Sequence, residues 1–153
     1  MEKKKSTQVM LTYSINEISF NLVDTAYSLK NKTKLKDWIE ASIRKEKKKT
    51  GTISFNFCSD EYLLSVNREH LNHDYYTDII TFDFCEADII SGDIYISIDR
   101  IKDNAKTMGK TIPNELSRVI IHGVLHLCGY KDKKPADAKQ MRDKEDYYLS
   151  LLR

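Results

Sequence analysis

The sequence predicts an α+β fold, a single mixed β-sheet covered by helices. Short runs of alternating apolar and polar residues, typical of half-buried strands, lie between segments whose apolar residues recur at helical spacing. The chain has 153 residues, of which 41% are hydrophobic, and this is enough apolar material for one core. We therefore expect one domain over residues 1–153.

The first half of the chain is expected to form a helix, a strand and a second helix. Residues 33–47 carry apolar side chains at the spacing of a helix with one buried stripe. In residues 52–58, isoleucine and phenylalanine alternate with polar residues, which indicates a half-buried strand. The second helix is expected over residues 59–68, where Ser59 or Asp60 can cap its N-terminus.

Two neighbouring antiparallel strands are expected next. Residues 79–84 and 93–98 are rich in β-branched and aromatic side chains, and a polar stretch that contains Gly92 separates them. A helix over residues 99–108 should follow and should end at Gly109.

Two more helices are predicted after residue 110. One starts near Pro113, a residue tolerated in a first turn, and ends at Gly129 in a left-handed conformation. The last helix spans residues 135–152. Its acidic residues are expected to form a solvated face, and they are Asp137, Asp143, Glu145 and Asp146.

Composition argues against several classes of protein. The 25 Lys and Arg residues against 23 Asp and Glu give a formal net charge of +2, so no global field indicates a nucleic-acid partner. Three dispersed cysteines form no C-x-x-C pair and favour the reducing cytoplasm. Residues 1–6 are charged, but no sustained apolar segment follows, so no export signal is expected. The longest apolar stretch, residues 119–130, is too short to span a membrane.

The most informative motif is the pair His122 and His126. Four residues apart on a helix, two imidazoles leave the same face about one turn apart, as ligands of a metal ion do. The pair falls at the edge of the predicted buried stripe, and hydrogen-bonded core histidines are the alternative. We favour a metal site at the C-terminal end of this central helix, in a cleft. The stripe consists of Leu116, Val119, Ile120, Gly123, Val124 and Leu127.

A metal ion that activates water needs a third protein ligand and an open position. Beyond the predicted helix end the chain turns back, and Asp132 is the nearest group able to close the site. An exposed loop aspartate is the alternative for this residue. Gly123 stands where the zinc-protease motif H-E-x-x-H has its glutamate, which argues against a peptidase of that design. Non-haem iron oxygenases also use two histidines and a carboxylate, but no β-barrel is predicted here.

Residues 122–130 resemble the signature H-G-x-L-H-L-x-G-Y-D-H of the YbeY family, bacterial endoribonucleases that act in ribosomal RNA maturation. Residues 67–82 resemble the family segment L-N-x-x-Y-R-x-x-D-x-x-T-D-V-L-S-F, and residues 92–94 resemble its G-D-I strand start. Together these segments run across about half of the chain in the family's order. The resemblance implies that the third metal ligand is Asp132, at the position of the signature's final histidine.

The chain departs from the family pattern at two positions. Asp132 brings a carboxylate in place of a neutral imidazole, which should make a bound water less acidic and favour harder ions. We expect one Zn²⁺, or another divalent transition metal, held by His122, His126 and Asp132. Leu71 occupies the place of an arginine that the family uses to contact phosphate.

Several side chains are candidates for the remaining roles, with ordinary surface charge as the alternative for the basic ones. Arg68, His70 and Asp78 are candidates for the cleft, and if their segment lies across the cleft from His122, either His70 or His73 would serve as an acid or base. No catalytic base is identified. The candidate RNA-binding residues are Arg68, Lys131 and Lys133.

The resemblance implies a metal-dependent endoribonuclease that cuts single-stranded RNA in rRNA maturation and ribosome quality control. The expected chemistry is hydrolysis by a water that the metal activates. Expected partners are an rRNA precursor and the small ribosomal subunit or its proteins, in the cytoplasm. Two alternatives remain: a non-catalytic ribosome-assembly factor that binds RNA and holds a structural metal, and a metal-dependent hydrolase of another substrate.

Overall fold

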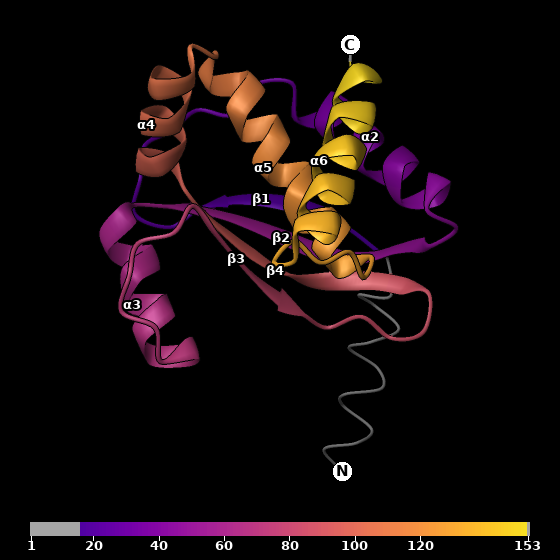
Figure 1. Cartoon of the computed structure of the whole chain (residues 1–153), viewed down its shortest axis with the longest axis horizontal. Helices are drawn as coiled ribbons and strands as arrows, with labels where there is room; N and C mark the ends of the chain where they lie inside the picture. Colours follow the sequence, from indigo (N-terminus) through magenta and orange to yellow (C-terminus); the bar gives the residue numbers. More distant parts are fainter. Residues whose placement is uncertain (1–15, 153) are drawn as a thin grey trace.

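A computed structural model of the protein describes residues 16–152 and shows one mixed four-stranded sheet with helices on both faces (Figure 1). The strands lie in the order β1-β2-β4-β3, with β1, β2 and β4 parallel and β3 antiparallel to β4. This architecture confirms the predicted fold class. The strands are β1 (Ile18–Leu22), β2 (Lys49–Cys58), β3 (Ile79–Asp83) and β4 (Ile89–Ser97).

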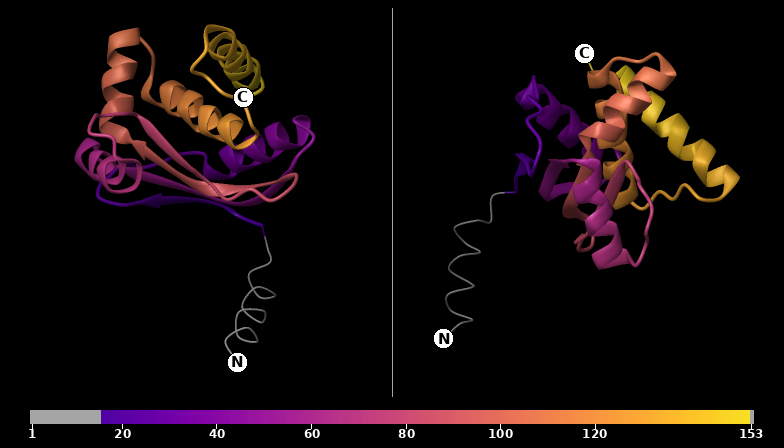
Figure 2. Two further views of the ribbon diagram at one scale, coloured as in Figure 1. Left: turned by 60° about the horizontal axis from the view of Figure 1, so that its bottom comes forward. Right: turned by 90° about the vertical axis from the view of Figure 1, so that its left-hand side faces the viewer.

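Among the described residues, four helices cover one face of the sheet, and a fifth helix, α3, covers part of the other (Figures 1 and 2). On the main face, α5 packs on β3 and β4, while α2 packs on β2. The outermost helix, α6, lies over α5 (Figure 2). The helices are α2 (Lys32–Lys45), α3 (Asp60–Leu71), α4 (Ile98–Met108), α5 (Ile112–Leu127) and α6 (Pro135–Ser150).

The core lies between the sheet and α5, and both surfaces carry the predicted periodicity. Ile53, Phe55 and Phe57 of β2 are fully buried, as the alternation in the sequence predicts. Every member of the predicted α5 stripe is also buried. Gly123 permits the close approach, because a Cβ there would lie 2.9 Å from Ile79 Cδ1.

Predicted helix ends are confirmed where a specific capping group sets them. Ser59 caps α3, because its hydroxyl accepts a hydrogen bond from the Tyr62 N–H. Gly109 and Gly129 follow α4 and α5 with φ angles of 64° and 107°, in the left-handed region that glycine adopts without steric cost.

Two strand predictions need correction. β1 was not predicted, although Ile18, Phe20 and Leu22 alternate with polar residues. Its partner β2 is parallel and lies about 30 residues away in sequence, so no hairpin turn marks the pair. β4 starts at Ile89 rather than at residue 93, because the polar stretch before residue 93 already pairs with the start of β2.

The predicted absence of an export signal concerns residues 1–6, which lie outside the described residues. Within residues 16–152, no helix is both long and apolar enough to cross a membrane.

We expect Gly92→Ala to lower the free energy of unfolding by about 3 kcal/mol, because the added Cβ would overlap the Phe82 carbonyl oxygen and press on Leu127. Urea denaturation of the purified protein measures the change. Gly109→Ala is the control: its Cβ would meet nothing within 4 Å, so only backbone strain of about 1 kcal/mol applies. Equal losses in the two variants would contradict the packing role of Gly92.

Candidate metal centre

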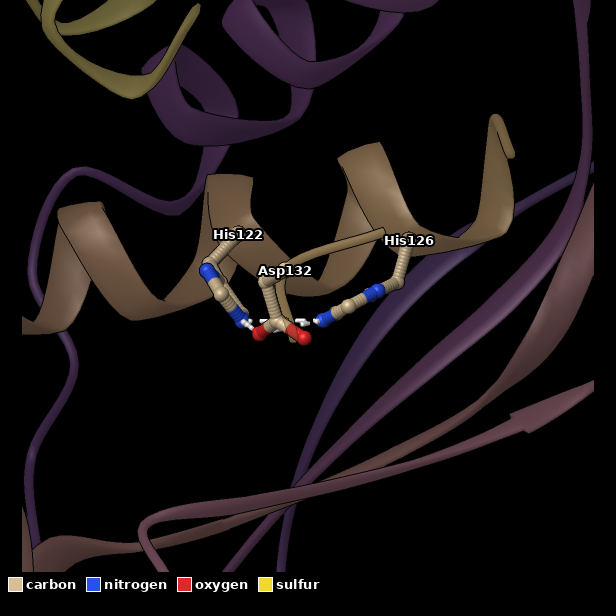
Figure 3. Close-up of side chains that lie close together, drawn as sticks. All are labelled: His122, His126 and Asp132. Atoms are coloured by element: carbon tan, nitrogen blue, oxygen red, sulfur yellow. Dashed lines mark hydrogen bonds and ion pairs between the residues drawn. The ribbon is translucent and has the colours of Figure 1, made fainter. Parts of the chain in front are cut away.

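The centre is built at the C-terminal end of α5, where the chain reverses direction. Past the helix, the N–H of Gly129 bonds to the His126 carbonyl, and the N–H of Tyr130 bonds to the Leu125 carbonyl, both at 3.0 Å. This Schellman-like turn sends the chain back alongside the helix. Asp132 therefore lies against the face that carries the two histidines (Figure 3).

The structure brings together the three side chains predicted to hold a metal. The Nε2 atoms of His122 and His126 are 3.0 Å apart, and Asp132 Oδ2 lies 3.2 Å from the first and 3.1 Å from the second. All three side chains are half-buried and converge on one point (Figure 3).

The other ring nitrogens determine which atoms of the histidines face that point. His122 Nδ1 lies 2.6 Å from Glu145 Oε2, and His126 Nδ1 lies 2.9 Å from the Tyr130 carbonyl oxygen. A carbonyl oxygen only accepts hydrogen bonds, so His126 Nδ1 carries the proton, and an ionised Glu145 imposes the same on His122. In the neutral rings, both Nε2 lone pairs then point at each other and at a carboxylate oxygen. This donor set fits a cation.

Both Nδ1 contacts follow the pattern of ligating histidines in metal sites, in which the second ring nitrogen donates to a carboxylate or a backbone carbonyl. Two nitrogen ligands and one oxygen ligand suit zinc and neighbouring divalent transition metals. The residues present therefore fit one such ion.

Glu145 was predicted to lie on a solvated face, and that prediction was wrong. The residue is 5% exposed, because it lies on the side of α6 that packs against α5. Arg118 balances its charge through a 2.8 Å hydrogen bond. Sequence reasoning missed a usable signal: Glu145 falls between Met141 and Tyr148 at helical spacing, and both are buried.

The electrostatic surroundings of His122 and Glu145 favour the charged form of each side chain. Burial alone would lower the pKa of His122, but the carboxylates of Glu145, Asp132 and Asp78 outweigh it and raise the pKa. Burial would likewise raise the pKa of Glu145, yet hydrogen bonds from His122 and Arg118 lower it. Without a metal ion, His122 therefore holds its proton more tightly than an exposed histidine does.

A second polar cluster secures the turn that carries Asp132. The hydroxyl of Tyr130 donates to Glu46 Oε1 at 2.6 Å, and Lys144 Nζ lies 3.1 Å from Glu46 Oε2. The hydroxyl of Tyr148 donates to the same carboxylate. Glu46, just past the end of α2, thus joins α2, α6 and the residue whose carbonyl orients His126.

A cleft of about 620 Å³ opens beside the centre, between α4, α5 and α6. Asp78 lines it, and burial raises the pKa of this carboxylate. The cleft's cations are Arg118 and Arg142, which the sequence did not single out. The lining residues are Asp78, Asn104, Thr107, Met108, Glu115, Arg118, Val119, His122, Asp132, Ala138, Met141, Arg142 and Glu145.

The other predicted cleft and RNA-binding residues lie elsewhere. Arg68, on the exposed end of α3, pairs with Asp74 at 2.5 Å, and His70 packs edge-on against Phe82. Lys131 and Lys133 are exposed on either side of Asp132 in the turn. None of these four side chains lines the cleft described above.

We expect Glu145→Gln to weaken metal binding about 10- to 100-fold, because a carboxylate behind a ligating imidazole orients the ring and raises its basicity. Competition with a chromophoric chelator measures the affinity. Asp146→Asn is a matched control, since this carboxylate also bonds to Arg118, at 2.6 Å, but is exposed and lies outside the His122 contact. An equal loss of affinity in both variants would rule out a specific role for Glu145.

In protein stripped of metal, the raised pKa of His122 makes the free energy of unfolding depend on pH. The stabilisation is complete below the ordinary histidine pKa of about 6.5 and is lost as the pH rises through the raised folded value. Urea unfolding in a chelator should give a smaller free energy above that folded pKa than at about pH 6. This difference in the free energy of unfolding between the two pH values should be smaller in Glu145→Gln. An unchanged difference would show that the pH dependence does not come from the contact between His122 and Glu145.

Comparison with known proteins shows similarity to one family over most of the chain. A family model described as Endoribonuclease YbeY matches residues 5–153. Endoribonuclease YbeY of Flavobacterium johnsoniae is 49% identical over 135 residues, which cover 88% of this chain and 96% of the relative. The corresponding protein of Cytophaga hutchinsonii is 51% identical over 135 residues, covering 88% and 94%. The solution structure of a Thermotoga maritima protein superposes with a TM-score of 0.63 and 28% identity, covering 89% of each chain.

Proposed function

Since the chain belongs to the YbeY endoribonuclease family, we propose that it is a metal-dependent endoribonuclease that hydrolyses single-stranded RNA at the centre formed by His122, His126 and Asp132. One observation carries the proposal: two imidazole lone pairs and a carboxylate oxygen converge beside a cleft. The chain would form a single metallohydrolase domain over residues 1–153.

The proposed ion is one Zn²⁺, with another divalent transition metal as the variant that the carboxylate ligand favours. When bound, such an ion polarises a phosphate oxygen and lowers the pKa of a coordinated water. Three protein ligands leave coordination positions open for water and substrate. The chain's own task is to hold these ligands, and Glu145 and the Tyr130 carbonyl do so from behind.

The cleft supplies groups for the RNA. Arg142 is 58% exposed at the cleft wall and lies 3.9 Å from Glu145, a longer contact than the 2.8 and 2.6 Å bonds that hold Arg118 to Glu145 and Asp146, so Arg142 is the better candidate to reach a phosphate. This arrangement provides a cation although Leu71 stands at the position of the family's arginine. Asp78 is our candidate for accepting a proton from the attacking water, because it lines the cleft and burial raises its pKa, which makes it a stronger base than an exposed aspartate.

Groups outside the cleft would hold the flanking RNA. We assign this role to Lys131 and Lys133, which flank the ligand Asp132, and to Arg68 and His70 at the end of α3. Exposed lysines and arginines attract phosphates without reading sequence. In the cell, the substrate would be an rRNA precursor on or near the small ribosomal subunit, in the cytoplasm, where the three free cysteines stay reduced.

Metal content and RNA cleavage test the proposal together. Protein purified without a chelator or affinity metal should contain about one equivalent of a divalent transition metal by plasma mass spectrometry, and His126→Ala and Asp132→Ala should lose it. Cleavage of a labelled unstructured RNA should fall by about two orders of magnitude or more in both variants. Asp132→His should retain the metal, because an imidazole replaces the carboxylate.

Together with an RNA-binding assay, the two measurements also separate the alternatives. Loss of the metal from the two variants, together with a wild type that binds RNA but does not cut it, would favour an assembly factor with a structural metal. A metal-loaded wild type that neither binds nor cuts RNA would favour a hydrolase of another substrate. Metal retained in Asp132→Ala would mean that this carboxylate is not a ligand.

A further inference from the structure

The cleft contains a buried carboxylate that the proposed reaction does not use. Glu115, in the first turn of α5, is 5% exposed and lines the cleft. Within residues 16–152, its carboxylate forms neither a hydrogen bond nor an ion pair. Burial raises the pKa of Glu115, and the charge of Asp78 adds to the effect. The Glu115 oxygens keep contact with the solvent of the cleft, so a ligand that supplies hydrogen-bond donors can reach them.

The charge of Glu115 disfavours direct contact with a phosphate and favours a ligand group that donates hydrogen bonds. The charges of Asp78, Arg118 and Arg142 all act on Glu115: Asp78 raises its pKa, and the two arginines lower it. The nearby Arg118 is held by Glu145 and Asp146 at 2.8 and 2.6 Å, so it does not neutralise Glu115 by contact. The fitting group is therefore rich in N–H donors.

The walls around Glu115 suit a flat ring with a polar edge. Val119 and Met141 are buried apolar side chains that line the cleft, and Met108 adds an apolar side chain at its exposed rim. Asn104 and Thr107 of α4 contribute further polar atoms to the same lining. Apolar walls with a few polar groups are typical of small-ligand pockets.

The position of Glu115 relative to the metal centre matches the dimensions of one nucleotide. Glu115 and His122 lie seven residues apart on α5, which corresponds to two turns and a rise of roughly 10 Å. Both line the same cleft. A nucleotide whose phosphate lies at the metal centre can therefore extend its base along α5 to Glu115.

The chemistry of the bases selects guanine. Its N1–H and N2–H₂ groups are adjacent donors that one carboxylate accepts together, whereas adenine and cytosine offer a single amino group beside an acceptor nitrogen. Uracil offers one N–H between two carbonyl oxygens, which a carboxylate repels. We propose that Glu115 forms a base-recognition subsite that accepts hydrogen bonds from a guanine adjacent to the cleaved phosphate. This inference rests on the proposed RNA substrate and adds a base preference to it.

Cut-site sequencing tests the subsite directly. The metal-loaded wild type, Glu115→Gln and the exposed control Glu69→Gln are incubated with a random single-stranded RNA pool, and the new ends are sequenced. The wild type and the control should show guanine about tenfold enriched over adenine at one position beside the cut. In Glu115→Gln, the ratio should fall toward one. Retained enrichment in Glu115→Gln, or cleavage by the wild type without base preference, overturns the subsite and leaves the nuclease standing.

A measurement of nucleotide binding tests the inference even if the protein cuts no RNA or if Glu115→Gln does not fold. Titration of the metal-loaded wild type with GMP, AMP, CMP and UMP, followed by NMR, should give the tightest binding for GMP, with shifts at Glu115 and its α5 neighbours. Equal affinities for the four nucleotides overturn the subsite, even if Glu115→Gln fails to fold. If the wild type cuts no RNA, the proposed function fails, and the GMP preference alone decides the subsite.

Discussion

The hydrogen bond between His122 and Glu145 is the interaction on which the rest of the centre depends. It places the proton on Nδ1, so that Nε2 presents a lone pair to the cleft, and it fixes the plane of the ring. The same bond joins α5 to α6. A carboxylate buried this deeply is tolerated because Arg118 and His122 both donate to it. The same hydrogen bond therefore contributes both to the packing of α6 on α5 and to the orientation of the His122 ring.

Glu46 contributes indirectly to the orientation of the second histidine, His126. His126 is oriented by the backbone carbonyl of Tyr130, and the Tyr130 side chain is anchored to Glu46 across the interface with α2. Trp38 of α2 donates to the Tyr148 carbonyl at 2.8 Å, which ties α2 to α6 at a further point. Each proposed metal ligand on α5 is thus positioned by an element that comes from another part of the chain. The helices around α5 therefore orient the proposed ligands in addition to covering the sheet.

The sequence predicts those parts of the site that depend on local periodicity. The spacing of His122 and His126, the buried stripe of α5 and the glycine that ends this helix are all properties of consecutive residues. Asp132 follows from the same reasoning, because a chain that reverses after Gly129 has few ways to turn. The resemblance to a known family then supported this ligand at a position where the residue itself departs from the pattern.

The parts that were missed depend on contacts between distant elements. β1 pairs in parallel with β2, and such pairing leaves no turn signal in the sequence. Glu145 is acidic among acidic neighbours, so composition alone places it in solvent, and only its phase relative to Met141 and Tyr148 shows that it faces α5. Arg118 and Arg142 were not singled out because nothing local indicates that α5 and α6 enclose a cleft.

Charge balance links the two departures from the family pattern. With Asp132 as a ligand, a divalent ion and one carboxylate give the first coordination shell a net charge of +1, where three imidazoles would leave +2. The attraction for a phosphate is correspondingly weaker. Leu71 removes a further cation, and the cleft also holds Asp78 and Glu115. Arg142 is the exposed cation at the cleft wall, 3.9 Å from Glu145, so the proposed phosphate binding would depend on it more heavily than in a site with three histidines and an arginine. The carboxylates would make the cleft better suited to the donor groups of a base, with its phosphate at the proposed metal ion.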